Sequence, residues 1–162
     1  MIVVADSSPL HYLVLIHAAD VPPTLYTQVL APKMVMDELR GAGAPAAVAA
    51  WIAHPPSWLE VHPDPPLDPT LARLDPGECA ALSLPLLVHA DRLLIDDWDG
   101  RAEAQSRHLF VIGTLGVLAR AHQLQLLDFD VALARLSQTN FYLSKQLIDS
   151  IRRWLSLGKN QP

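Results

Sequence analysis

Short apolar runs bounded by polar or turn-forming residues recur along the chain. Three of them are Met1 to Ala5 (MIVVA), Arg92 to Ile95 (RLLI) and Leu109 to Ile112 (LFVI). Their apolar residues are consecutive and do not alternate with polar ones, which is typical of strands buried on both faces of a parallel sheet. A further strand is predicted at Trp58 to Val61. The runs together therefore indicate a buried parallel sheet.

Helical patterns lie between these runs. Ser8 followed by Pro9 has the order of an N-cap and a first helical residue, so a helix is predicted over Leu10 to Ala18. Pro85 interrupts one of the later patterns. Helices are also predicted over residues 33–41 after Pro32, 46–53, 77–89, 100–107 and 113–123, and two amphipathic ones in the C-terminal third. Strands alternating with helices predict an α/β fold, a three-layer α/β/α sandwich around a mostly parallel sheet of four to five strands.

The length of 162 residues and the lack of an internal repeat predict one domain over residues 1–162. The Pro-rich region 54–76 contains the predicted strand and then a rigid, extended connection. It shows no pattern of a second core. We therefore expect the predicted sheet and helices to share one hydrophobic core.

Charge and cysteine content narrow the class of protein. The formal net charge of −5 argues against broad adhesion to nucleic acid, although a nuclease with clustered carboxylates would also be acidic. The single Cys79 suits a reducing compartment. The first residues lack the basic and long apolar parts of a signal peptide, and Pro85, Asp91 and Arg92 interrupt the apolar region 82–95. We expect a cytoplasmic protein without a membrane segment.

Acidic residues follow two of the predicted strands. Asp6 comes directly after the first strand, and Asp96 comes directly after residues 92–95. Ligands bind at the carboxyl ends of the strands in an open parallel sheet, so we expect both side chains at the same edge. Glu38 (in VMDELR) and Glu78 (in LDPGECAA) are expected on helices at that edge. Four carboxylates from separate parts of the chain are thus predicted to converge.

Such a set of carboxylates indicates a site for a hard divalent cation, Mg²⁺ or Mn²⁺. Without a cation the carboxylates would repel one another, and with it they can promote attack of water on a phosphodiester. Two other phosphoryl-transfer enzymes fit worse. A haloacid-dehalogenase-type phosphatase would need an Asp where Ser8 stands, and a response-regulator receiver would need a Lys where Gly113 and Thr114 follow the late strand.

Five motifs occur in an order and spacing that resemble those of PIN-domain proteins. They are VVADSSPLHYL, VMDELR, LDPGECAAL, LLIDDWDGRAEA and VIGTLGVLARAHQL. The resemblance extends over nearly the whole chain, to the terminal FYLSKQLIDSIRRWL. It is closest to the PIN-like branch related to VapC-type toxins of bacterial toxin–antitoxin systems.

The resemblance implies a metal-dependent endoribonuclease with Asp6, Glu38, Glu78 and Asp96 as its catalytic acids. The metal ligands would be Asp6, Glu78 and Asp96, with Asp97 as an alternative or additional ligand. It further implies Mg²⁺ or Mn²⁺ as cofactor, RNA as substrate, a small antitoxin protein as partner, and a homodimer. The alternative is a catalytically weak PIN-like scaffold that binds a small protein or RNA.

The segment IDDWD departs from the family pattern, in which a single Asp and a Ser or Thr are usual. Whether Asp96 or Asp97 faces the metal therefore stays open, while Asp99 is predicted to cap the helix that follows.

Three residues are candidates for contact with the substrate, namely Ser7, Arg101 and Thr114. Arg101 falls in the first turn of a predicted helix, where the dipole disfavours a cation, so we expect an acidic neighbour or an RNA phosphate beside it, with a plain surface Arg as the alternative. Thr114 is most simply the N-cap of a helix over Leu115 to Gln123, and the resemblance adds a role at the edge of the site.

Overall fold

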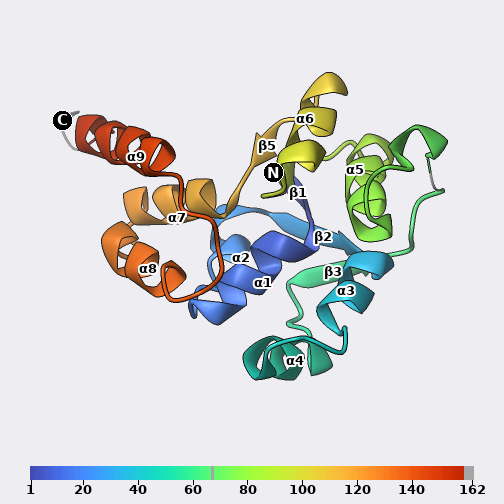
Figure 1. Ribbon diagram of the computed structural model, residues 1–162, viewed down its shortest axis with the longest axis horizontal. Helices are drawn as coiled ribbons and strands as arrows, with labels where there is room; N and C mark the ends of the chain where they lie inside the picture. Colours follow the sequence, from blue (N-terminus) through green and yellow to red (C-terminus); the bar gives the residue numbers. More distant parts are fainter. Residues whose placement is uncertain (67, 159–162) are drawn as a thin grey trace.

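A parallel sheet of five strands forms the centre of the computed structural model, which describes residues 1–66 and 68–158 (Figure 1). The strands are β1 (Ile2–Ala5), β2 (Gln28–Pro32), β3 (Leu59–His62), β4 (Arg92–Leu94) and β5 (Val111–Ile112). They lie in the order β3-β2-β1-β4-β5, and every pair of neighbours is parallel. The prediction of an α/β fold with four to five mostly parallel strands is confirmed.

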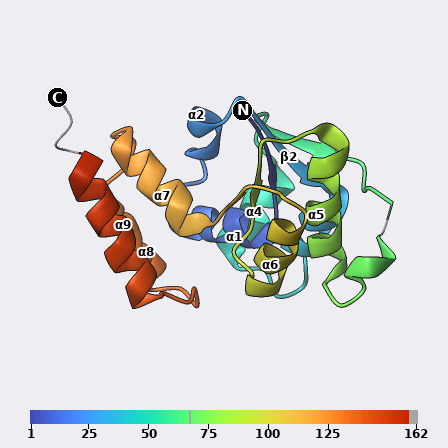
Figure 2. The ribbon, with the colours of Figure 1, turned by 90° about the horizontal axis from the view of Figure 1, so that it is seen from above.

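Helices cover both faces of this sheet and bury its apolar residues. On one face lie α1 (Ser7–Leu15) and α7 (Thr114–Gln123), and on the other lie α5 (Pro76–Val88) and α6 (Trp98–Ser106) (Figure 2). Val3, Val4 and Leu93 are completely buried, because their strands have a helix layer on each side. This double burial explains the consecutive apolar residues in the strands.

The remaining helices extend the two layers. They are α2 (Pro22–Leu25), α3 (Lys33–Leu39), α4 (Ala46–Ala53), a 3₁₀ turn η1 (Pro69–Leu71), α8 (Phe129–Leu136) and α9 (Lys145–Gly158). The two C-terminal helices pack against α7, away from α5 (Figures 1 and 2). None of the helices in the described residues has the length and apolar character needed to cross a bilayer.

Several boundaries differ from the sequence-based predictions. Helix α1 begins at Ser7, not at Leu10, and Asp6 occupies the N-cap position with an extended backbone, so the prediction of Ser8 as N-cap is wrong. Pro85 lies inside α5 without ending it. The helix α2 and the strand β2, with only three consecutive apolar residues before Pro32, were not located by the apolar pattern. The predicted Pro-rich connection contains η1, and its Leu67 lies outside the described residues.

The connections reverse direction between β1 and β4. From β1 the chain passes outward to β2 and β3, and it then returns to β4 on the other side of β1. The main-chain N–H of Asp6 donates to the carbonyl oxygen of Leu94, at 2.9 Å, where these two strands end. A reversal of this kind opens a crevice at the carboxyl ends of the strands, and ligands bind in such crevices.

Candidate functional site

A cleft of about 450 Å³ lies at the carboxyl ends of β1 and β4. Its lining includes six residues that the sequence analysis selected, namely Asp6, Ser7, Glu38, Glu78, Asp96 and Asp97. The other two candidates do not line the cleft, but Thr114 hydrogen-bonds to Asp96, and the charge of Arg101 acts on the Asp96 carboxylate. The fold therefore brings the candidate residues from five separate segments to one place.

Asp6 is the most deeply buried of these acids, with only 2% of its surface exposed. Its Oδ1 has no hydrogen-bond partner among the described residues. Burial raises the pKa of Asp6 to about 7; the carboxylates of Glu38 and Glu78 act in the same direction, while the main-chain N–H groups of Ser7 and Ser8 oppose the rise. A buried carboxylate oxygen without a partner is costly, and a bound cation would satisfy it.

Glu38 reaches the cleft from α3 and contacts the start of α5. Its Oε1 accepts a hydrogen bond from the main-chain N–H of Gly77 at 3.0 Å. A Cβ at position 77 would overlap the Glu38 carboxylate, so a glycine is needed for this close approach. The first turn of α5 supplies N–H groups without helical partners and a positive dipole end, both of which favour the Glu38 anion.

Glu78 lies in the first turn of α5, beside Glu38. Its Oε2 accepts a hydrogen bond from the main-chain N–H of Asp75 at 3.2 Å, as in a capping box. Burial raises the pKa of Glu78, and the carboxylates of Asp97, Asp75 and Glu38 raise it further. Glu78 therefore caps a helix and also belongs to the group of mutually repelling acids in the cleft.

Asp96 is fixed by Thr114 at the start of α7. The Thr114 main-chain N–H donates to Oδ1 at 2.7 Å, and the Thr114 hydroxyl donates to Oδ2 at 2.6 Å. Burial raises the pKa of Asp96, whereas the two hydrogen bonds from Thr114, the charge of Arg101 and the Ser8 hydroxyl lower it. A carboxylate oxygen can accept more than one hydrogen bond or coordinate a cation as well, so Asp96 keeps the capacity to bind an ion.

Asp97 caps α6, and the prediction that Asp99 would do so is wrong. The Asp97 side chain accepts a hydrogen bond from the main-chain N–H of Gly100 at 2.8 Å. Helix α6 begins at Trp98, two residues before the predicted start, which makes Gly100 the third helical residue. An N-cap side chain reaches the N–H of the second or third helical residue, and Asp97 has that position. Asp99 is exposed in the first turn.

Arg101 and Thr114 lie outside the lining of the cleft and act on Asp96. Arg101 Nη1 donates to the carbonyl oxygen of Ile95 at 2.9 Å, and its charge lowers the pKa of Asp96. Thr114 is completely buried. It is the first residue of α7, with Gly113 at the N-cap position, so the prediction of Thr114 as N-cap is wrong.

One wall of the cleft comes from a segment outside the predicted site residues. The segment is Asn140, Phe141 and Tyr142, between α8 and α9. The Tyr12 hydroxyl donates to Asn140 Oδ1 at 3.1 Å, and the rings of Tyr12 and Phe141 meet edge to face with centroids 4.8 Å apart. Tyr142 is 86% exposed. The adjacent aromatic residues in NFYL were the available signal.

Ser8, Tyr12 and Asp75 also line the cleft and were not selected. Ser8 and Tyr12 follow Asp6 on α1, and Asp75 precedes Glu78 by three residues. Their positions next to selected acids were the signal that could have found them.

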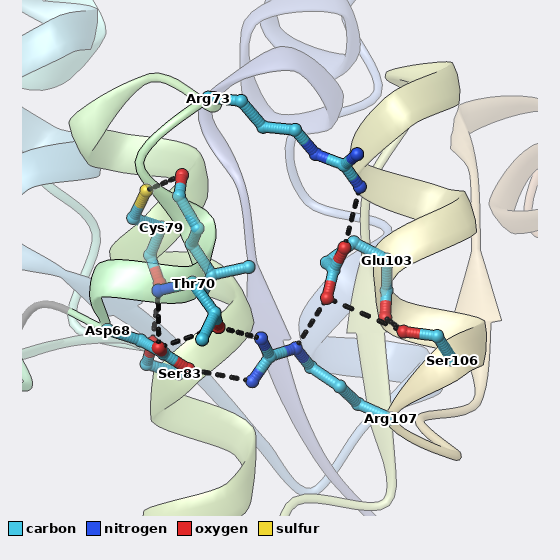
Figure 3. A network of polar contacts seen from close by, with 9 residues as sticks. Asp68, Thr70, Arg73, Cys79, Ser83, Glu103, Ser106 and Arg107 are labelled. Carbon is cyan, nitrogen blue, oxygen red and sulfur yellow. Dashed lines mark hydrogen bonds and ion pairs between the residues drawn. The ribbon is translucent and has the colours of Figure 1, made fainter.

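A polar network holds the segment before α5 against α6 (Figure 3). Arg107 donates to Asp68 at 2.9 Å, to Glu103 at 3.0 Å and to the Thr70 hydroxyl at 2.7 Å. Arg73 donates to the other oxygen of Glu103 at 2.7 Å. The network therefore links the region just before Glu78 to the helix that Asp97 caps.

The cleft offers the oxygen donors that a hard divalent cation requires. Asp6, Glu38, Glu78, Asp96 and Asp97 are all available from its walls. Within residues 1–66 and 68–158, however, no three His, Cys, Asp or Glu side chains are grouped closely enough to hold an ion as they stand. The partnerless Oδ1 of Asp6 is the atom that fits a cation best.

Comparison with known families gives one match. A family model for the PIN domain matches residues 2–156. No curated protein and no solved structure gives a significant match. PIN domains are generally nucleases that use divalent metal ions, and they are associated with RNA.

Proposed function

The chain belongs to the PIN domain family, and on that premise we propose that it is a metal-dependent endoribonuclease that hydrolyses phosphodiester bonds of RNA. We propose further that it is the toxin of a toxin–antitoxin pair, related to VapC-type toxins. The observation that best supports the enzymatic proposal is the Asp6 carboxylate, which is buried at the reversal of the sheet among other acids and has one oxygen without a partner in the described part of the chain.

The catalytic acids in this proposal are Asp6, Glu38, Glu78 and Asp96. Asp6, Glu78 and Asp96 would hold Mg²⁺ or Mn²⁺, with Asp97 beside them at the same cleft. When bound, such an ion polarises the phosphodiester and lowers the pKa of the attacking water. Asp6 must lose its proton before it can bind the ion, because its pKa is about 7.

Neighbouring residues position these acids. Thr114 and Arg101 hold Asp96 in one orientation through the hydrogen bonds and charge described above. Gly77 holds Glu38 at the start of α5. Ser7 lines the cleft beside Asp6 and is the proposed substrate contact, while Arg101 and Thr114 would act on the substrate only through Asp96.

The proposed protein partners are a small antitoxin and a second copy of the chain. An antitoxin would cover the acidic cleft, and a basic side chain would suit its charge. For the homodimer, α9 offers Trp154 and Leu157, which are 47% and 70% exposed. In contrast, Leu10 and Leu13 of α1 are buried in the core, so these two side chains cannot contribute to an interface. Light scattering of the native protein and of Trp154→Glu tests the dimer.

The direct test of the enzymatic proposal is incubation of the purified protein with total RNA and with tRNA. We expect cleavage with Mn²⁺ and none with EDTA. Asp6→Asn and Asp96→Asn are expected to abolish cleavage while circular dichroism shows a folded protein. Equal cleavage by Asp6→Asn would refute the assignment.

A second candidate function is a PIN-like scaffold that binds a small protein or RNA without efficient chemistry. Two observations favour it: among the described residues the acids are not grouped closely enough to hold an ion as they stand, and both Asp96 oxygens already accept hydrogen bonds from Thr114. Calorimetry with Mn²⁺ separates the two candidates. An enzyme should bind the ion and cleave RNA, whereas a scaffold should bind it poorly or bind it without cleavage.

A further inference from the structure

A second cavity of about 440 Å³ adjoins the acidic cleft. The two share five lining residues, which are Ser7, Ser8, Tyr12, Glu38 and Asn140. A linear molecule that occupies one of them can therefore continue into the other. The volume of the second cavity lies within the range of about 300–1,000 Å³ that is typical of small-ligand sites.

The chemistry of the second cavity differs from that of the cleft. Among the described residues that line it, Glu38 is the only acidic one, whereas the cleft also has Asp6, Asp75, Glu78, Asp96 and Asp97. The remainder of its lining is uncharged or aromatic and includes His11, whose pKa is lowered by burial. The cleft suits a cation and the phosphate that it neutralises, and the neighbouring cavity suits a group without charge.

Aromatic and amide groups in this cavity match a nucleobase. The rings of His11 and Tyr12 lie edge to face with centroids 5.0 Å apart, and aromatic side chains of this kind contact bases by stacking. Because Asn140 Oδ1 accepts from the Tyr12 hydroxyl, the amide NH₂ group is the side available to donate to a base. The Gly43 side of the cavity is open, since a Cβ there would meet nothing within 4 Å.

We propose that this cavity is a nucleoside subsite, which binds the nucleoside adjacent to the scissile phosphate of an unpaired RNA strand. The inference rests on the proposed endoribonuclease function and adds a specificity-determining site to it. Tyr12 and Asn140 stand at the boundary of the two cavities, so they contact the strand where it passes from the cleft into the subsite. A segment of a protein partner is the competing occupant.

The test fills the subsite with a side chain at Gly43. The backbone of Gly43 lies outside the left-handed region, so Gly43→Leu fits the local conformation, and its Cβ would meet nothing within 4 Å. Ala49→Leu is the matched control, because Ala49 is exposed on α4 and lines neither cavity. Thermal unfolding of both variants establishes that they are folded.

The measurement is kcat/KM with Mn²⁺ for two substrates, a single-stranded oligoribonucleotide and methyl p-nitrophenyl phosphate, which has no nucleoside. We expect Gly43→Leu to lower the ratio of kcat/KM for the oligoribonucleotide to kcat/KM for methyl p-nitrophenyl phosphate by about tenfold, through a higher KM for the oligoribonucleotide. This is the size expected for one lost base contact. Ala49→Leu should leave the ratio at the native value.

Different failures of this experiment have different meanings. If the native protein hydrolyses neither substrate, the proposed function and the subsite are both refuted. If the native protein hydrolyses both and Gly43→Leu keeps the native ratio, the subsite alone is refuted. A Gly43→Leu variant that keeps the ratio but loses binding of a protein partner would assign the cavity to that partner and would likewise overturn the proposal.

Discussion

The carboxylate of Glu38 on α3 accepts a hydrogen bond from the main-chain N–H of Gly77 in the first turn of α5, at 3.0 Å. This contact joins two helices whose residues are far apart in the sequence. It also places Glu38 beside Glu78 at the mouth of the cleft.

Gly77→Ala should displace Glu38 without unfolding the protein. The new Cβ would overlap the end of a flexible side chain, so Glu38 can move away, and alanine has the higher helix propensity. We expect the free energy of unfolding in urea to change by no more than about 1 kcal/mol. Mn²⁺ affinity should fall by about 10- to 100-fold, as for lost support of a metal ligand.

The matched control for this variant is Gly43→Ala, since a Cβ at position 43 meets nothing within 4 Å. Its free energy of unfolding should equal that of the native protein within about 0.5 kcal/mol. Native Mn²⁺ affinity in Gly77→Ala would show that the position of Glu38 does not matter for ion binding.

Thr114→Val should weaken the site through Asp96. The substitution keeps the shape and the main-chain N–H but removes the hydroxyl that donates to Asp96 Oδ2. We expect a loss of about 2 kcal/mol in the free energy of unfolding and a fall of about 10- to 100-fold in RNA cleavage. Thr114→Ser retains the hydroxyl and should keep most of the activity; equal losses in both variants would contradict the role of this hydrogen bond.

Asp6→Asn should stabilise the metal-free protein at alkaline pH. Burial raises the pKa of Asp6 from 3.8 to about 7, so the folded state binds the proton more tightly than the unfolded state. The proton on Asp6 contributes its full stabilisation of the native protein below pH of about 4. This contribution is lost as the pH rises through about 7, a change on the order of 4 kcal/mol in the free energy of unfolding. In EDTA, urea unfolding of Asp6→Asn should therefore show higher stability than the native protein at about pH 8 and similar stability at about pH 4.

Asp99→Asn provides the control for this pH experiment, because Asp99 is an exposed acid in the first turn of α6. Its stability should follow the native pH dependence within about 0.5 kcal/mol. A native protein whose stability is flat between pH of about 4 and 8 would refute the buried, protonated state of Asp6.

Mn²⁺ binding should depend on pH for the same reason. A metal ligand must be deprotonated, so below pH of about 7 the ion competes with the proton on Asp6. We expect the apparent affinity to fall by about tenfold for each unit of pH below 7, with release of a proton on binding. Calorimetry in buffers of different ionisation enthalpy measures that proton; constant affinity between pH of about 5.5 and 7 would exclude Asp6 as a ligand.

Arg107→Ala should loosen the segment before α5. The variant loses the contacts to Asp68, Glu103 and Thr70 together. We expect faster amide hydrogen exchange in residues 68–75 and a Tm lowered by a few degrees. Arg73→Ala is the comparison, because Arg73 is 67% exposed and makes one of these contacts. The same exchange rates in both variants would show that Arg107 has no special role.

The meeting of Asp6 and Asp96 at one edge of the sheet could be predicted, because it follows from the local apolar pattern and from a general rule of parallel sheets. Asp6 and Asp96 each end an apolar run, and parallel strands bring their carboxyl ends to one edge. The order of the strands then placed β1 beside β4, which the pattern alone does not specify.

The details of the acidic loop could not be predicted because three acids in four residues each satisfy the rule for an N-cap. Asp97 and Asp99 have the same side chain, and the start of α6 decides which of them caps it. That start depends on packing: Gly100 lies against Ile95, and a Cβ at position 100 would overlap the Ile95 side chain.

The adjacent aromatic residues in NFYL mark residues 140–142 in the sequence, but they do not indicate where in the fold this segment lies. Tyr12 and Asn140 are 128 residues apart, and their contact depends on how α8 and α9 pack against α7. The same holds for Glu38 and Gly77, which are 39 residues apart. Contacts between helices at such separations are decided by the three-dimensional packing.

The position of the first strand in the middle of the sheet has a consequence for synthesis of the protein. As the chain leaves the ribosome, β1 can pair with β2, but its other edge has no partner until β4 has emerged. The cleft then still lacks the wall from residues 140–142. A nascent chain at this stage, which has not reached residues 140–142, therefore has the acids of the cleft but not the wall that encloses them.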